Sequence, residues 1–229
     1  MPDSSKPVVH RRVDWGDLRR LTPFSDVWGH DRGRPIDRYY IENFLEQHRG
    51  DIRGRVLEVQ SGVYTHRYNS GVTQSDILDI DGSNPDATVI ADLGRESSLP
   101  AETFDCFVFT QTLHIIYDVG AVLSNISRAL KPGGVLLCTV PAVSRVNYEN
   151  GGLESGDFWR FTGAALRRLF AQHFAGSVAV EGYGNVMVCA AFLYGLAVEE
   201  LTNEELDSVD PWFPLLFSIR AVKARPSDD

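Results

Sequence analysis

Acidic side chains recur near the ends of apolar segments in the first half of the chain. Glu58 lies near the end of the first segment, Asp76 follows it by 18 residues near the end of the second, and Asp92 follows the third. A carboxylate at the end of a second strand can accept hydrogen bonds from both hydroxyl groups of a ribose, and a separation of roughly 20 residues suits that role. We therefore expect Asp76 to bind a ribose. Asp79 and Asp81 are alternatives, and a solvated acidic loop is the competing interpretation.

The third and fourth segments end in groups suited to a purine ring and to proton transfer. Asp92 can accept an adenine amino proton while Leu93 packs on the ring. His114 follows the fourth segment in the stretch TQTLH, and a histidine can accept the proton of a hydroxyl nucleophile at neutral pH. As a general base, His114 would give the rate profile an inflection at about pH 6 to 7. The alternative is a histidine packed at the sheet edge that donates to a backbone carbonyl.

A long polar segment, 142–161, carries candidate groups for binding a second molecule. Loops of this length are usually functional or mobile. Tyr148 and Trp159 can stack on the ring of an acceptor, and Arg160 can hold a phosphate or carboxylate. The alternatives are packing of the aromatic rings beneath the loop, and ion pairing of the arginine with Glu149, Glu154 or Asp157.

These side chains need a scaffold that brings the ends of several strands together. Apolar, strand-like segments are expected at 55–59, 72–78, 88–91, 106–110 and 135–140. Near-continuous apolar strands with short connections fit a parallel sheet covered on both faces, and such sheets bind ligands at the carboxyl ends of their strands. The sequence therefore predicts an α/β, doubly wound fold.

Capping residues mark where helices begin. Pro35 precedes an apolar pattern at helical spacing, and Asp118 and Thr162 can cap two later helices. Thr202 and Glu205 match a capping box. Each of these positions is predicted to open a helix.

The two ends of the chain differ from this alternating pattern. Residues 1–34 are polar and interrupted by proline and glycine, which indicates a loosely ordered arm before a single domain over 35–229. A buried helix is expected over 185–201. The segment 213–223 is expected to be a final strand at the sheet edge, antiparallel because no crossover helix precedes it.

The composition excludes several classes of protein. The 229 residues are 43% hydrophobic and 23% charged, as in ordinary globular domains, and the formal net charge of −9 argues against a broad basic surface for nucleic acid. The longest apolar run, 186–198, is too short to span a bilayer and the first residues lack the apolar core of a secretory signal, so a cytoplasmic protein without membrane insertion is expected. The three cysteines and six histidines lack ligand spacing, so we expect no metal and buried reduced thiols.

The order of these pieces resembles the class I S-adenosylmethionine (AdoMet)-dependent methyltransferases, particularly the methyltransferase type 11 group. The matching stretches, which cover residues 55–141, are LEVQSG, SDILDIDGSN, ATVIADL, LPAETFDCFVFTQTLHIIYD and RALKPGGVLLCTVP. Three further stretches, DRGRPIDRYYIENFL, GDFWRFT and YGNVMVCAAFLYGLAVEEL, resemble a bacterial subgroup associated with glycan or secondary-metabolite gene sets.

This resemblance implies a Rossmann-like fold with a mostly parallel seven-stranded sheet and an antiparallel C-terminal edge strand. It implies AdoMet as the cofactor, with Glu58, Gln60 and Gly62 around the methionine moiety and Gln111 beside the sulfonium. It also implies the adenine and ribose roles already given for Asp92, Leu93 and Asp76. The expected reaction is methylation, mainly at oxygen, of a small-molecule or glycan-related acceptor.

Two other functions are weighed against this one. Gln60 stands where the family carries a glycine, so its side chain either crowds the cofactor or hydrogen-bonds the methionine carboxylate. A protein that keeps the fold for binding or regulation but has lost turnover is therefore the alternative. A nicotinamide-dependent dehydrogenase is rejected because the stretch QSGVYT over 60–65 does not supply the required G-x-G-x-x-G pattern.

Overall fold

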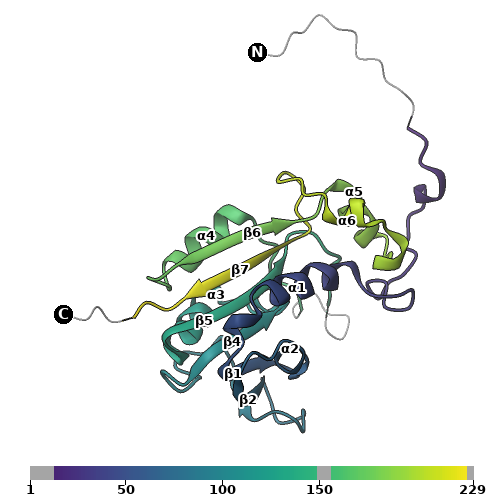
Figure 1. Cartoon of the computed structure of the whole chain (residues 1–229). Helices are drawn as coiled ribbons and strands as arrows, with labels where there is room; N and C mark the ends of the chain where they lie inside the picture. The colour runs from purple at the N-terminus through teal and green to yellow at the C-terminus, as the bar shows by residue number, and fades with distance from the viewer. Residues whose placement is uncertain (1–12, 149–155, 226–229) are drawn as a thin grey trace, which may run out of the picture.

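A computed structural model describes residues 13–148 and 156–225, and it contains a seven-stranded sheet in the order β3-β2-β1-β4-β5-β7-β6 (Figure 1). All pairings among the first five strands are parallel, whereas β7 runs antiparallel to both β5 and β6. The predicted mostly parallel sheet with an antiparallel C-terminal strand is confirmed. The antiparallel strand lies between β5 and β6, so β6 occupies the edge of the sheet. The strands are β1 (Gly54–Val59), β2 (Val72–Asp79), β3 (Val89–Ile90), β4 (Phe104–Thr110), β5 (Leu130–Pro141), β6 (Val178–Tyr183) and β7 (Leu216–Val222).

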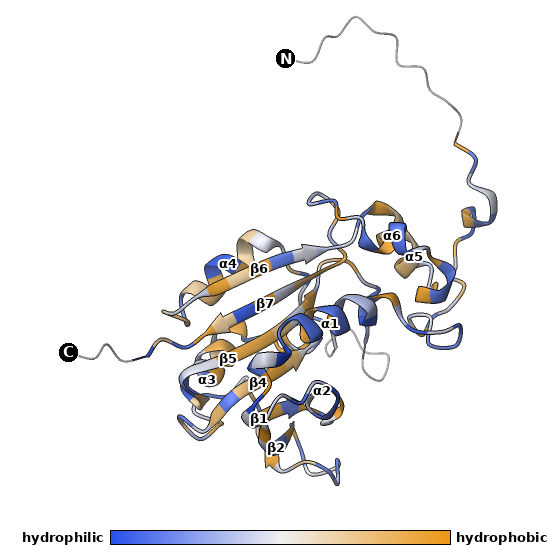
Figure 2. Ribbon diagram, in the orientation of Figure 1, coloured by the Kyte–Doolittle hydropathy of each residue, from blue (hydrophilic) through white to orange (hydrophobic). Residues whose placement is uncertain are grey.

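Helices cover both faces of this sheet, as the apolar strands require. Alternation along β4 explains how one strand serves two cores: Phe107 packs in the core that contains α3 and α4, whereas Val108 packs in the core that contains α1 and α5. In Figure 2 the central strands β4 and β5 carry much of the apolar colouring. The helices are α1 (Ile36–Gln47), α2 (Val63–Arg67), α3 (Val119–Ala129), α4 (Gly163–Ala171), α5 (Val186–Leu193) and α6 (Asn203–Asp207), with short 3-10 turns at Gly16–Leu18, Arg49–Asp51, Leu113–Ile115 and Val198–Glu200.

The predicted helix starts are confirmed by their hydrogen bonds. The Asp118 carboxylate accepts from the amide of Ala121 at 2.9 Å, and the Thr162 hydroxyl caps α4 in the same way. Thr202 and Glu205 form the reciprocal capping box of α6. Because these caps depend on neighbouring residues only, the sequence was sufficient to place them.

The helix expected over 185–201 is shorter than predicted and ends at Leu193. Gly195 has a φ of +73°, the left-handed conformation in which glycine commonly ends a helix. A side chain there would also meet the backbone of Ser25, because a Cβ would lie 2.2 Å from the Ser25 carbonyl oxygen. Glycine therefore both terminates α5 and leaves room for the N-terminal segment.

That N-terminal segment is fixed to α5 rather than loosely ordered in its described part. The amide of Phe24 donates to the carbonyl of Tyr194 at 2.7 Å, and the Tyr194 hydroxyl donates to the carbonyl of Leu18 at 2.6 Å. Long-range bonds of this kind leave no local pattern in the sequence, which explains the wrong expectation. The contact also places the segment around residue 28 beside the carboxyl ends of the strands, where a cavity opens.

Two remaining expectations concern the cysteine side chains and membrane-spanning helices. Cys106, Cys138 and Cys189 are buried and not disulfide-bonded, which confirms the prediction of buried thiols. Burial raises the pKa of all three. No helix within the described residues combines the length and the apolar character needed to cross a membrane.

Candidate functional site

Two adjoining cavities lie at the carboxyl ends of the parallel strands. The first has a volume of about 510 Å³ and is lined from the ends of β1, β2, β3 and β4. The second has a volume of about 350 Å³ and extends from the same edge toward α1, α5 and the end of β5. Arg38, Gln60, Gln111 and Ile115 line both, so the two cavities form one continuous site. Its position is the one expected for ligands in an open α/β sheet.

Glu58 lines the first cavity and stabilises the turn that follows β1. Its side chain is only 3% exposed, and its two carboxylate oxygens accept from the amides of Tyr64 and Thr65 at 3.1 and 2.7 Å. Burial raises its pKa, and these amide bonds act in the opposite direction. Glu58 lines the cavity, and its direct contacts fix the start of α2.

Gln60 lies in the turn itself and adopts a φ of +65°, the conformation that favours glycine. Its backbone N–H donates to the backbone carbonyl of Leu78, and its backbone carbonyl accepts from the side-chain amide of Asn84. The turn therefore takes a glycine-like backbone conformation despite the larger side chain. Gly62 begins α2 and does not line either cavity, whereas Gln111 lines both with a φ of +46°.

Asp76, for which a ribose role was expected, does not lie at the site. Asp76 lies inside β2, is 4% exposed, and forms an ion pair of 2.6 Å with Arg55. It also accepts from the side chain of Thr88, and it lines neither cavity. Because β2 continues three residues further, the carboxylate at the strand end is Asp79, which does line the first cavity.

Asp92 and Leu93 lie where the sequence predicted, on the wall of the first cavity. Leu93 is buried in the core and offers an apolar surface. The Asp92 carboxylate accepts from the amide of Gly94 at 2.9 Å and pairs with Arg95 at 3.1 Å. The described geometry thus combines an apolar wall with an adjacent acceptor.

Arg38 is a site residue that the sequence reading missed. It extends from α1 to line both cavities, and its guanidinium donates to the Tyr64 hydroxyl at 2.8 Å. In the sequence it belonged to a short basic stretch, and only the packing of α1 against the sheet brings it to the strand ends. Arg38 places a permanent positive charge where the two cavities join.

His114 lines the second cavity and is held next to two charged residues. Its Nε2 lies 3.4 Å from a carboxylate oxygen of Asp157, and Asp157 in turn pairs with Arg160 at 2.6 Å. Burial lowers the pKa of His114 to about 4, with Asp157 raising it and Arg160 lowering it. Burial thus favours the uncharged form of His114, which moves its titration below the neutral range expected from the sequence.

The three residues expected to bind an acceptor lie outside both cavities. Trp159 stacks on Tyr117 with ring centroids 5.8 Å apart and donates its indole N–H to the Tyr117 carbonyl. Arg160 pairs with Asp157, and Tyr148 is 45% exposed. Glu149 and Glu154, the other ion-pair partners considered for the arginine, lie outside the described residues. Neighbouring Asp157 and Phe158 line the cavities instead, so the structure does not bring Tyr148, Trp159 and Arg160 to the site.

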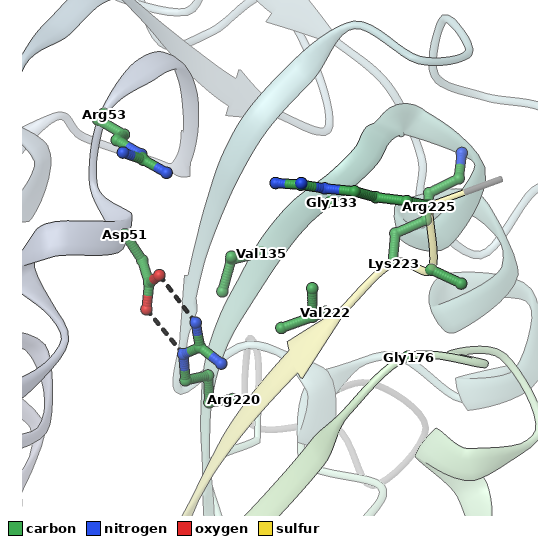
Figure 3. A pocket seen from close by; sticks show the side chains of 10 residues that line it. Asp51, Arg53, Gly133, Val135, Gly176, Arg220, Val222, Lys223 and Arg225 are labelled. Carbon is green, nitrogen blue, oxygen red and sulfur yellow. Dashed lines mark hydrogen bonds and ion pairs between the residues drawn. The ribbon is translucent and has the colours of Figure 1, made fainter. Parts of the chain in front are cut away.

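Another hollow lies at the opposite edge of the sheet, near the amino ends of β1 and β5 (Figure 3). Within it, the Arg220 guanidinium makes a bidentate ion pair with the Asp51 carboxylate, with N···O distances of 2.7 and 2.9 Å. These groups satisfy one another and connect the turn before β1 to β7. We assign this hollow a structural role, since the strand ends that bind ligands lie on the other side.

The chain matches known proteins in this part of the fold. Residues 73–138 match a family described as a methyltransferase domain. Comparison with curated protein sequences gives no match. The family match covers β2 to β5 and therefore includes three of the strands whose ends form the first cavity.

Solved structures with the same fold share little sequence with the chain. An S-adenosylmethionine-dependent methyltransferase from Mesorhizobium loti is 18% identical, with a TM-score of 0.51 over 82% of this chain and 98% of that one. One from Archaeoglobus fulgidus is 15% identical, with a TM-score of 0.52 over 81% and 94%. The 1,6-didemethyltoxoflavin-N1-methyltransferase of Burkholderia thailandensis, solved with bound 1,6-didemethyltoxoflavin and S-adenosylhomocysteine, is 14% identical, with a TM-score of 0.51 over 81% of this chain and 77% of that one. The chain therefore has the fold of the S-adenosylmethionine-dependent methyltransferases, and its segment 73–138 matches a methyltransferase domain.

Proposed function

We propose that the protein is an AdoMet-dependent methyltransferase that binds its cofactor in the first cavity and a small-molecule acceptor in the second. The observation that carries this proposal is the coincidence of the family match with the cavity: residues 73–138 contribute Asp79, Asp92 and Leu93 to its wall. The pocket combines apolar side chains with carboxylates, amides and a guanidinium, and convergent polar groups of this kind are typical of a cofactor site.

The lining of the first cavity fits the three chemical parts of AdoMet. Asp79 supplies a carboxylate for the ribose hydroxyls, and Leu93 with Asp92 supplies an apolar wall and an acceptor for adenine. Arg38 supplies a cation for the methionine carboxylate at the junction of the two cavities. Bound AdoMet would provide a methyl group that is already electrophilic.

The work left to the protein is to align the acceptor and to exclude water. Gln60, Gln111 and Ile115 line both cavities, so a molecule in the second cavity lies next to the cofactor site. The uncharged His114 can hydrogen-bond a hydroxyl group there and receive its proton. We infer methylation at oxygen, and a glycan-related or secondary-metabolite acceptor remains our prediction for the pathway.

The glycine-like backbone of Gln60 favours an active enzyme over an impaired relative. Its φ of +65° keeps the turn after β1 open without a glycine, and its amide still bonds to β2 at 2.9 Å. The substitution has therefore not disrupted the cofactor-side turn. We accordingly place the binding-only function second.

Isothermal titration with AdoMet tests the proposal, with Asp79→Asn compared against Asp81→Asn. Asp81 is an exposed carboxylate of the same loop that does not line the cavity. Loss of one charge-assisted hydrogen bond, about 1.5 to 3 kcal/mol, predicts roughly 10- to 150-fold weaker binding for Asp79→Asn and unchanged binding for Asp81→Asn. Absence of AdoMet binding by the folded wild-type protein would refute the proposed function.

A further inference from the structure

The second cavity is lined by a carboxyl group of which one oxygen has no hydrogen-bond partner among the described residues. Asp37 lies in the first turn of α1 and lines this cavity. Its Oδ1 atom is buried and has no hydrogen-bond partner among the described residues. Burial raises the pKa of this carboxyl, against the opposing effects of Arg38 and His30. A buried polar atom without a partner is costly, so its retention calls for an explanation outside the folded chain.

His114 presents a second unsatisfied group to the same cavity from a different element. It belongs to the 3-10 turn Leu113–Ile115 after β4, and its Nδ1 is buried without a hydrogen-bond partner in the described part of the chain. Its Nε2 lies 3.4 Å from a carboxylate oxygen of Asp157. The side chains of Asp37, from α1, and His114, from the turn after β4, thus line one cavity, and each has a hydrogen-bonding atom that no described residue satisfies.

The charges around this cavity disfavour an anionic ligand. Arg38 is the only lysine or arginine among the described residues that line it, and its guanidinium already bonds to Tyr64. Two carboxyl groups, Asp37 and Asp157, belong to the same lining. Asp157 is already paired with Arg160, so a phosphate or carboxylate on the acceptor would find no unpaired cation and two carboxyl groups in the described part of this lining.

We propose that the second cavity binds an uncharged, hydroxyl-bearing small molecule, whose hydroxyl group is held between Asp37 and His114. This inference rests on the proposed function, because the cavity is an acceptor site only if the first cavity holds the cofactor. A hydroxyl group suits the pair because it is both a donor and an acceptor. The apolar remainder of the molecule meets the lining side chains of Trp28, Phe192 and Leu215.

Asp37 is then a binding residue that costs the folded protein stability. Replacing Asp37 removes the penalty of its unpaired buried oxygen, which offsets the loss of its attraction to Arg38. Asp37→Ala should therefore leave the free energy of unfolding unchanged or increase it, while acceptor binding falls. A structural carboxylate would give the opposite result for stability, so the two roles separate in one variant.

The test measures probe binding to protein saturated with S-adenosylhomocysteine, by saturation-transfer NMR. Phenol and methyl glucoside are the neutral probes, and phenyl phosphate and glucose phosphate are their anionic counterparts. We expect at least one neutral probe to bind more tightly than its counterpart, and to lose roughly tenfold in affinity in Asp37→Ala and in His114→Ala. Asp17→Ala, which removes an exposed carboxylate outside both cavities, is the matched control and should bind like the wild type.

The outcomes distinguish this inference from the proposed function. Failure of AdoMet to bind in the titration described above contradicts the proposed function itself. When the cofactor binds normally, three results would overturn the acceptor inference alone. These are that neither neutral probe binds, that the anionic probes bind as well or better, or that both variants bind the probes like the control. Loss of stability in Asp37→Ala would likewise overturn the binding role and assign Asp37 to the fold.

Discussion

Burial of His114 should make the free energy of unfolding depend on pH, and His114→Gln should remove this contribution to the pH dependence. The His114 side chain is 12% exposed, and burial lowers its pKa to about 4. In the unfolded chain the same imidazole has a pKa of about 6.5. Between these two values the unfolded state holds a proton that the folded state does not, so protonation favours unfolding.

The sign and the size of the effect follow from that difference. The stabilising contribution is fully present above about pH 6.5 and is lost progressively as the pH falls toward 4. With one pKa unit equal to about 1.4 kcal/mol, lowering the pH from 7 to 5 costs the folded state about 2 kcal/mol through His114 alone. Asp157, at 3.4 Å, opposes the shift without reversing it.

The assay is denaturant unfolding of the wild type and His114→Gln at both pH values. The remaining histidines are common to both proteins, so the comparison isolates residue 114. The wild type should lose about 2 kcal/mol more than the variant on acidification. An equal loss in the two proteins, or a larger loss in His114→Gln, would show that His114 is not buried in its uncharged form and would refute the reasoning. The same low pKa predicts that any rate inflection due to His114 lies near pH 4 rather than near neutrality.

Three further substitutions test the turn after β1 and the cap of α4. Gln60→Gly should raise the free energy of unfolding by about 1 kcal/mol because glycine adopts its φ of +65° without strain, and thermal denaturation measures this. Glu58→Ala should lower that free energy by about 1 to 3 kcal/mol and weaken AdoMet binding, since it leaves the amides of Tyr64 and Thr65 without their acceptor; unchanged urea denaturation and titration curves would contradict this. Thr162→Ala should lower stability by about 1 kcal/mol through loss of the α4 cap while leaving AdoMet affinity unchanged, and an altered affinity would show that α4 influences the site.

Features that depend on nearby residues could be predicted from the sequence. The near-continuous apolar run of β4 and the caps at Asp118 and Thr162 are local features of the sequence, so sheet and helix positions followed from local patterns. The cofactor-side residues Asp92 and Leu93 also follow directly after a strand. Their place at the cavity is therefore set by the strand end itself.

The errors arose where strand length or distant packing decides the geometry. Asp76 and Asp79 are both carboxylates in one short stretch, and only the actual end of β2 shows that Asp79 reaches the cavity. Arg38 and Asp37 come from α1, which is brought to the strand ends by tertiary packing with no local signal. The pKa of His114 depends in the same way on burial, which a sequence pattern near a strand end does not determine.

A crystal structure of the protein with S-adenosylhomocysteine would test the central claim most directly. We predict that the ligand occupies the first cavity, with its ribose hydroxyl groups within hydrogen-bonding distance of Asp79 and its adenine against Leu93. Its carboxylate should lie next to Arg38, at the junction with the second cavity. Ligand density at the opposite edge of the sheet, or a ribose bound by Asp76 instead, would contradict the account.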